Sequence, residues 1–167
     1  MLRKLDQKDA PFMLEWMKDS DINSIFSANF AEYTIDKVKD FIENSFDEEN
    51  QHFAVVDEND EYQGTISLKN ISSKDKNAEY AVVFRKKAQG TGLAKQATLE
   101  ILNYAFEELN LEKVYLNVLE DNIRARKFYE KTGFQKEGVF INHKFVGNRF
   151  HNLWWYGMLK KNFEIEG

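Results

Sequence analysis

The chain contains 167 residues, of which 43% are hydrophobic and 14% aromatic, and this is enough for one domain with a substantial core. It has no cysteine and only three histidines, which excludes disulfides and thiol catalysis and argues against structural zinc, so we expect no bound metal. The net charge is −5, and the segment from Asp19 to Glu61 holds 13 acidic and two basic residues, which argues against nucleic acid as a partner and favours a cationic one.

The sequence shows neither a membrane-spanning segment nor a boundary between domains. No apolar run approaches the roughly 18 residues needed to cross a bilayer, and the first residues lack the apolar stretch of a signal peptide. No repeat, low-complexity tract or linker divides the chain. We therefore expect a soluble cytoplasmic protein that does not bind membranes and whose residues 1–167 form a single domain.

The first third of the chain predicts a short strand and two helices. Residues 2–5 favour a strand, and residues 6–18 favour a helix with Pro11 in its first turn, where the missing N–H costs little. Thr34 can cap a second helix, because the apolar residues that follow recur at the three- and four-residue spacing of one buried face.

The middle of the chain alternates strands with one long helix. Residues 53–56 and 64–68 flank a polar turn and predict an antiparallel hairpin, and residues 78–84 predict the next strand. Apolar residues recur every four positions from 92 to 110, which predicts an amphipathic helix. A crossover of this length joins parallel strands, so the strand expected at 114–119 should lie parallel to the one before the helix.

The last third predicts a helix and a hairpin. The helix covers residues 123–131 and ends at Gly133 in a left-handed cap, and the hairpin pairs 138–145 with 150–158. The sum is an α+β fold, a mixed and mostly antiparallel sheet with a central parallel pair and helices on both faces.

A glycine-containing loop joins the strand at 78–84 to the long helix. A helix start offers N–H groups without intrahelical partners, and glycines let an anion approach that backbone closely. Four basic residues and no acidic one lie between Arg85 and Lys95. The segment therefore predicts a cradle for a pyrophosphate.

Such loops occur in several classes of protein, and three alternatives stand beside this one. A dinucleotide fingerprint needs a third glycine where Lys95 stands, although Glu120 could imitate its ribose-binding carboxylate. A triphosphate-binding loop needs four residues between its first glycine and a Gly-Lys pair, which this loop lacks. The glycines could also serve only a tight turn.

Two motifs in register resemble the GNAT superfamily of N-acetyltransferases. Residues 89–94, Gln-Gly-Thr-Gly-Leu-Ala, match the pattern Q/R-x-x-G-x-G/A, and residues 122–134 match the second motif at the usual distance. The end of the chain resembles the branch that contains ribosomal-protein, spermidine and aminosugar-nucleotide acetyltransferases. Residues 85–88 depart from the family, because they replace a proline-containing turn that is common there.

The resemblance implies a GNAT fold whose central parallel strands splay apart to admit acetyl-CoA as cosubstrate. It places the pyrophosphate on the backbone N–H groups of the glycine loop and the pantetheine arm between the splayed strands, with Asn122 as a hydrogen-bond partner. The implied cofactor-binding residues are Val82, Val83, Phe84, Gln89, Gly90, Thr91, Gly92, Leu93, Ala94, Lys95 and Asn122.

Two residues, one in the second motif and one on the strand before the first, suit acid and base catalysis. Tyr129 is the candidate general acid, because a phenol with a pKa of about 10 is protonated at neutral pH and can protonate a departing thiolate. Glu79 is the candidate base that takes a proton from the amine, because it is a carboxylate inside an apolar strand on the same side as Ala81 and Val83.

The acceptor is left open among a polyamine, an aminosugar nucleotide and a protein N-terminal amine. The resemblance also implies a groove that binds the acceptor. Carboxylates and aromatic side chains of the kind that bind a protonated amine are expected there: Glu15, Trp16, Asp19, Asp21, Glu32, Tyr33, Trp154, Trp155 and Tyr156. The alternative to an enzyme is a non-catalytic acyl-CoA-binding sensor module. Exposed aromatic residues would also suit a homodimer.

Overall fold

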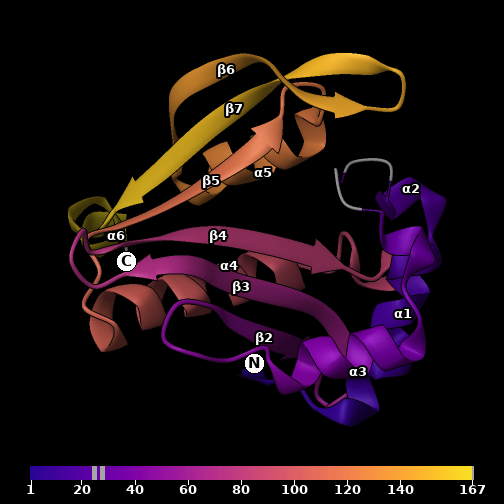
Figure 1. Cartoon of the computed structure of the whole chain (residues 1–167). Helices are drawn as coiled ribbons and strands as arrows, with labels where there is room; N and C mark the ends of the chain where they lie inside the picture. The colour runs from indigo at the N-terminus through magenta and orange to yellow at the C-terminus, as the bar shows by residue number, and fades with distance from the viewer. Residues whose placement is uncertain (24–25, 27–28, 167) are drawn as a thin grey trace.

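The structure is a computed structural model that describes residues 1–23, 26 and 29–166, with side chains through residue 163 (Figure 1). The strands are β1 (Leu2–Lys4), β2 (Gln51–Val56), β3 (Tyr62–Ser72), β4 (Asn77–Phe84), β5 (Lys113–Leu119), β6 (Gln135–Val146) and β7 (Arg149–Leu159). The helices are α1 (Ala10–Lys18), α2 (Ser20–Asn23), α3 (Ile35–Glu43), α4 (Leu93–Asn103), α5 (Ile123–Thr132) and α6 (Lys160–Glu166). Single turns are η1 (Gln7–Asp9), η2 (Phe30–Glu32), η3 (Lys86–Ala88) and η4 (Tyr104–Glu108).

The strands form one mixed sheet in the order β1-β2-β3-β4-β5-β7-β6. Every neighbouring pair is antiparallel except β4 and β5, which are parallel as the length of the crossover predicted. The parallel pairing covers only residues 77–79 of β4 and 113–115 of β5. Beyond Glu79 the two strands diverge, and Figure 1 shows the wedge between them.

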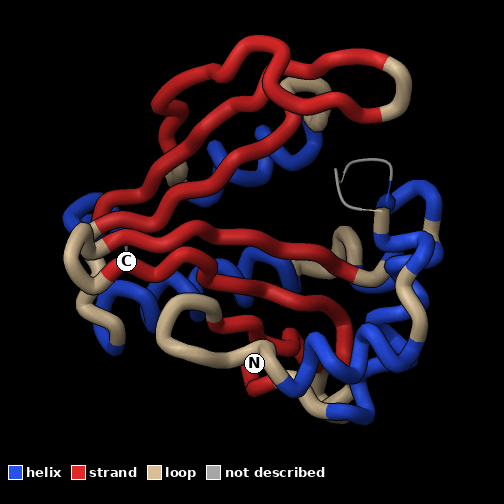
Figure 2. The backbone as a smooth tube through the Cα atoms, in the orientation of Figure 1, coloured by secondary structure: helices blue, strands red, loops and turns tan. Residues whose placement is uncertain are grey.

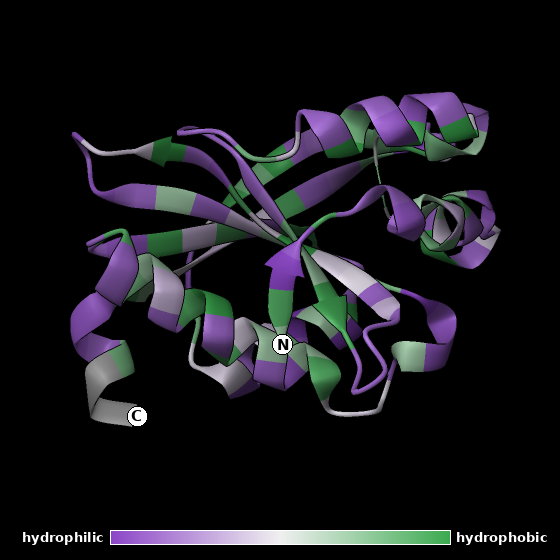
Figure 3. Cartoon of the chain, turned by 90° about the horizontal axis from the view of Figure 1, so that it is seen from below, coloured by the Kyte–Doolittle hydropathy of each residue, from purple (hydrophilic) through white to green (hydrophobic). Residues whose placement is uncertain are grey.

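Helices cover both faces of the sheet, as expected (Figure 2). Side chains of β2 alternate between the two cores, because Val55 packs in the core under α4 whereas Ala54 and Val56 pack in the core under α1 and α3. The helices carry hydrophobic and hydrophilic stretches side by side, as amphipathic helices do (Figure 3). None of the described helices is long and apolar enough to cross a membrane.

Local signals set most of the element boundaries. Thr34 Oγ1 accepts a hydrogen bond from the Lys37 N–H at the start of α3, and Gly133 ends α5 with a φ of 107°, both as predicted. The helix expected at 6–18 instead starts as the turn η1, because Asp6 and Asp9 form a reciprocal capping box there. The helix expected at 92–110 ends at Asn103 and continues as the π turn η4.

Candidate active site

The loop between β4 and α4 presents an unpaired stretch of backbone. Gly90 and Gly92 have φ values of 77° and 87°, and a Cβ atom built on either would meet nothing within 4 Å. The first helical hydrogen bond of α4 runs from the Gln96 N–H to the Gly92 carbonyl. The N–H groups of residues 90–95 donate to no atom of the part of the chain that the structure describes. An anion at this helix start would meet free donors and the positive end of the dipole, so the loop fits a pyrophosphate.

The basic side chains of this loop contribute less to the field than their number suggests. Three of them pair with carboxylates of α1, α2 and the residue before β3: Arg85 with Glu15 at 2.6 Å, Lys86 with Asp21 at 3.1 Å, and Lys87 with Glu61 at 2.5 Å. Lys95 makes no ion pair with the described residues. Backbone N–H groups and Lys95 are therefore the main attractants for an anion, and Glu15 and Asp21, expected in an acceptor groove, bind the loop instead.

A cleft of about 310 Å³ opens where β4 and β5 separate. Four residues singled out in the sequence line it: Glu79 and Val82 on β4, Asn122 at the start of α5, and Tyr129 within α5. The remaining lining residues are Phe26, Lys69, Tyr80, Ala81, Asn117, Val118, Leu119, Lys144, Val146 and Leu153. The wedge in the sheet thus brings both candidate catalytic residues to one cavity.

Two of the candidate cofactor residues on β4 do not line this cleft. The Val83 side chain packs against the core under α1 and α3, and Phe84 is buried in the core under α4. Their backbone nevertheless belongs to the stretch of β4 that is paired with β3 on one edge and is left unpaired by β5 on the other. A backbone contact with an added strand therefore stays a prediction for both residues.

Tyr129 is a buried phenol whose hydroxyl is free. Its ring packs edge-on against Tyr80 and Phe134, with centroid distances of 6.0 Å in each case. The side chain is 9% exposed, and its hydroxyl makes no hydrogen bond with the described residues. Burial raises the pKa of Tyr129 to about 12, so the phenol keeps its proton at neutral pH.

Glu79 is held in place by three donors. Its carboxylate accepts from Asn117 Nδ2 at 2.7 Å and from Asn70 Nδ2 at 3.3 Å, and it pairs with Lys69 Nζ at 3.4 Å. The side chain is 14% exposed and lies at the last residue pair before β4 and β5 separate. The carboxylate is therefore held in a fixed position at the narrow end of the wedge.

Asn122 and Gln89 both contact the first turn of α5. Asn122 caps α5, because its Oδ1 accepts from the Ala125 N–H at 3.2 Å, and its Nδ2 has no partner among the described residues. The Asn122 amide can therefore act both as a helix cap and as a donor to a ligand. Gln89 Oε1 accepts from Arg124 Nη1 at 3.1 Å, which links the glycine loop to the first turn of α5.

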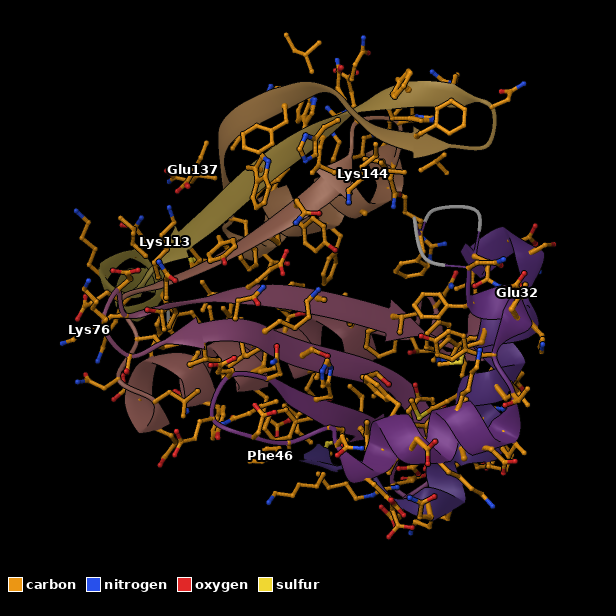
Figure 4. All side chains as sticks on the ribbon, in the orientation of Figure 1. Glu32, Phe46, Lys76, Lys113, Glu137 and Lys144 are labelled. Atoms are coloured by element: carbon orange, nitrogen blue, oxygen red, sulfur yellow. The ribbon has the colours of Figure 1, made fainter. Side chains whose placement is uncertain are left out.

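Sequence reasoning missed four polar residues of this region, namely Lys69, Asn117, Arg124 and Lys144. Asn117 could have been found, because Glu79 is paired with Tyr115 and the residue two positions on shares its face of the sheet. The other three offered no signal: Lys144 reaches the cleft only through the position of the β6–β7 hairpin, as Figure 4 shows.

A mixed sheet that splits beside a loop of free N–H groups defines the fold of acetyl-CoA-dependent N-acetyltransferases. Comparisons with known proteins give the family. A family model described as "Acetyltransferase (GNAT) domain" matches residues 1–135, so the chain belongs to the GNAT acetyltransferases and uses acetyl-CoA as its cosubstrate.

Several relatives cover most of the chain. The spermidine N(1)-acetyltransferase of Vibrio cholerae serotype O1 is 28% identical over 153 residues, which are 91% of this chain and 88% of that protein. The putative ribosomal N-acetyltransferase YdaF of Bacillus subtilis is 33% identical over 103 residues, which are 62% of this chain and 56% of that protein. A crystal structure of the Vibrio cholerae spermidine N-acetyltransferase in complex with CoA and spermine matches with a TM-score of 0.90 and 25% identity, covering 98% of this chain and 97% of that one.

Proposed function

We propose that Tyr129 and Glu79 are the acid and base with which this N-acetyltransferase moves an acetyl group from acetyl-CoA directly to a primary amine. The observation that supports this assignment is the placement of both side chains in one cleft, next to the unpaired edge of β4. Residues 89–95 would hold the pyrophosphate, with the N–H groups of residues 90–95 as donors, because the Gln89 N–H donates to the Lys86 carbonyl at 3.3 Å. Asn122 and the backbone of Val82, Val83 and Phe84 would hold the pantetheine arm. All of these residues come from one sheet and its helices, which supports a single acetyltransferase domain over residues 1–167.

The chemistry requires the nitrogen to lose two protons and the sulfur to gain one. An alkylammonium has no lone pair, so its proton passes to Glu79 before the nitrogen attacks the thioester carbonyl carbon. Negative charge then grows on the carbonyl oxygen, where a backbone N–H of the unpaired β4 edge would stabilise it by roughly 3 kcal/mol. As the C–S bond breaks, the sulfur takes the hydroxyl proton of Tyr129. The acylated nitrogen then passes its second proton to the resulting phenolate, which leaves a neutral amide and restores the hydroxyl of Tyr129.

The acceptor that we propose is a polyamine. Relatives from Vibrio cholerae and Escherichia coli that cover about nine tenths of this chain are named as spermidine acetyltransferases, and other relatives that cover as much are named only as N-acetyltransferases. In the cleft of this chain, Glu79 offers a carboxylate to a terminal ammonium group. The apolar side chains of Phe26, Val146 and Leu153 line the same cleft and suit a methylene chain.

One observation favours a second class of acceptor. Lys69 and Lys144 line the cleft, and Lys144 has no partner among the residues that the structure describes. A second or third ammonium of a polyamine would be repelled by them, whereas a carboxylate or phosphate on the acceptor would be attracted. This arrangement suits a peptide N-terminus with acidic residues, or an aminosugar nucleotide.

Assembly into a homodimer or a larger oligomer is also part of the proposal. Exposed apolar side chains gather on the β6–β7 hairpin, where Phe140, Ile141, Phe145 and Phe150 are 47 to 78% exposed. A related solved structure is described as a dodecameric spermidine N-acetyltransferase from Vibrio cholerae. The cytoplasmic location expected from the sequence stays a prediction.

An acceptor panel tests the proposed function. Release of free CoA from acetyl-CoA is measured with spermidine, spermine, acidic and basic peptides with free N-termini, and an aminosugar nucleotide. We expect turnover with polyamines, increased by Lys144→Glu and unchanged by Lys76→Glu at the far end of the sheet (Figure 4). Preference for an anionic acceptor that is lost in Lys144→Glu would replace the polyamine by the second class. CoA binding without turnover of any amine would indicate a sensor module.

A further inference from the structure

Arg85 is a buried cation at the point where β4 ends and the glycine loop begins. The residue is 6% exposed, which is unusual for arginine, and its guanidinium lies 4.6 Å from the ring centroid of Phe12. Its backbone N–H donates to the Gln63 carbonyl at 2.9 Å, and its carbonyl accepts from the Ala88 N–H at 3.0 Å. The same residue therefore terminates the ladder with β3 and starts the turn η3.

The guanidinium connects this point to two other elements. Nε and Nη2 donate to the two carboxylate oxygens of Glu15 on α1, at 2.6 and 3.0 Å. Nη1 donates to Glu61 Oε1 at 2.9 Å and to the Tyr62 carbonyl at 3.0 Å, at the start of β3. Burial in this network fixes the end of β4 relative to α1 and β3, because a bidentate carboxylate pair specifies geometry as well as charge.

The loop beyond Arg85 has few other contacts that could set its shape. Residues 90–95 direct their N–H groups to no described partner. The remaining restraints lie mostly before residue 90: the ion pairs of Lys86 and Lys87 with exposed carboxylates, and the bond from the Gln89 N–H to the Lys86 carbonyl. From Gln89 onward they are the Gln89–Arg124 bond, the bond from Thr91 Oγ1 to the Ala88 carbonyl at 2.6 Å, and the start of α4. A ligand that binds through free N–H groups needs them ordered beforehand, or it spends binding energy on ordering them.

We propose that Arg85 is a positioning residue for the CoA-binding loop, and that Glu15 and Glu61 are its partners in that role. The inference rests on the proposed function, because it requires that residues 89–95 bind the pyrophosphate. Arg85 does not face the cleft and takes no part in proton transfer. Its effect is to hold the first turn of the loop in the shape that presents the backbone donors.

A positioning role and a purely electrostatic role of this cluster predict opposite effects of Glu15→Gln on CoA binding. Arg85→Met removes both the clamp and a positive charge, so either effect would weaken binding of an anion. Glu15→Gln removes a negative charge near the loop, which by electrostatics strengthens anion binding. The same change breaks the bidentate pair between Glu15 and Arg85. If Arg85 positions the loop, loss of this pair weakens anion binding. The sign of the effect of Glu15→Gln therefore separates the two explanations.

The chain provides a matched control in the cluster around Arg3. Arg3 binds both oxygens of Asp9 at 2.8 Å and Asp60 Oδ1 at 2.6 Å, so that it also joins one guanidinium to two carboxylates. Neither Arg3 nor Asp60 contacts the glycine loop in any described interaction. The Asp60 side chain is 50% exposed and that of Glu15 is 54% exposed, so Asp60→Asn is the control for Glu15→Gln, as Arg3→Met is for Arg85→Met.

The experiment measures the dissociation constant of CoA by titration calorimetry, together with KM values and melting temperatures of the full-length variants. We expect about tenfold weaker CoA binding for Arg85→Met and about fivefold weaker binding for Glu15→Gln. The KM for acetyl-CoA should rise in parallel, and the KM for the amine should stay within about twofold. The Arg3→Met and Asp60→Asn proteins should bind CoA as the natural chain does, even where their melting temperatures fall.

Three results would overturn the inference. Unchanged or tighter CoA binding by Glu15→Gln would leave Arg85 as a source of charge or stability only. Equal losses in the Arg85 and Arg3 series would show a general effect of destabilisation. If the natural chain itself failed to bind CoA, the proposed binding role of residues 89–95 would fall, and this inference would fall with it.

Discussion

Removal of the hydroxyl group of Tyr129 tests whether this residue protonates the sulfur. Replacing Tyr129 by Phe keeps the ring that packs on Tyr80 and Phe134 and removes the only group assigned to protonate the sulfur. We expect kcat to fall by about 100-fold, with CoA affinity nearly unchanged, because general acid catalysis is typically worth 10²–10⁴-fold. The measurement is steady-state kinetics with a titration of CoA. Tyr115→Phe, on the same strand as Asn117, is the control, and an equal rate for Tyr129→Phe would remove Tyr129 from the mechanism.

His52 gives the chain a predictable response to acid. Burial, together with the nearby Lys69 ammonium, lowers the pKa of His52 from 6.5 to about 4, and its Nδ1 lies 2.6 Å from Ser67 Oγ. The unfolded chain takes up this proton near pH 6.5 and the folded chain does not, so the free energy of unfolding falls as pH drops from 6.5 towards 4.

In His52→Gln that part of the acid sensitivity, of order 1–3 kcal/mol, should disappear. Urea unfolding of both proteins at pH 7, 5.5 and 4.5 measures it, with His143→Gln on the exposed β6 strand as control. A natural chain and a His52→Gln variant that lose stability in parallel over this range would contradict the assignment.

The motifs indicated several residues that line the cleft but not the residues that contact them. The spacing of the second motif placed Tyr129 and Asn122 correctly on and at the start of α5, because a helix fixes side-chain directions from sequence alone. Lys69 and Lys144 belong to strands that reach the cleft through the tertiary arrangement of the sheet. No local pattern encodes that arrangement.

At the scale of elements, the length of the crossover predicted the parallel β4–β5 pair, whereas the separation of the two strands was expected only from the family resemblance. The length of the intervening helix requires a crossover and hence parallel strands. The position at which they part depends on what packs on each side: β4 stays paired to β3 along its length, while β5 pairs with β7 from residue 113 to 119. Two strands with different partners on their outer edges diverge when the sheet twists.

The acidic and basic segments that are separate in the sequence contact each other in the folded chain. The acidic segment from Asp19 to Glu61 and the basic loop at 85–87 were interpreted separately, as an acceptor surface and a phosphate site. The structure joins them, because Lys86 pairs with Asp21 and Lys87 with Glu61. These opposite charges, far apart in the sequence, form contacts between elements that the sequence analysis did not predict.

The close approach of β3 to β4 gives a prediction for stability. A Cβ atom on Gly64 would lie 2.5 Å from the Val83 carbonyl oxygen and 2.7 Å from Phe84 Cδ1. Because the first of these is backbone, Gly64→Ala should cost about 2–4 kcal/mol of unfolding free energy. Gly138→Ala on β6, whose Cβ would meet nothing within 4 Å, should change it by less than about 1 kcal/mol. Chemical denaturation compares the two, and equal effects would show that β4 can shift.

On the scale of the whole molecule, two cores on opposite faces of one sheet hold the wedge open. The core under α4 contains Tyr129 and Phe84, and the core under α1 and α3 contains Val83, so both sides of the cofactor path are anchored in packed interior. The order of elements in the sequence predicted this layering. The placement of the β6–β7 hairpin, which brings Lys144 and Val146 to the cleft, had to come from the structure.

The central claim is that coenzyme A binds through the free backbone N–H groups of residues 90–95 beside the parted strands. The most direct test is a backbone amide NMR titration with CoA on the natural chain. We expect the largest chemical-shift changes on the amides of residues 90–95, with a second group on β4 from 80 to 84. Saturable binding that leaves both groups unmoved and shifts amides elsewhere would contradict it.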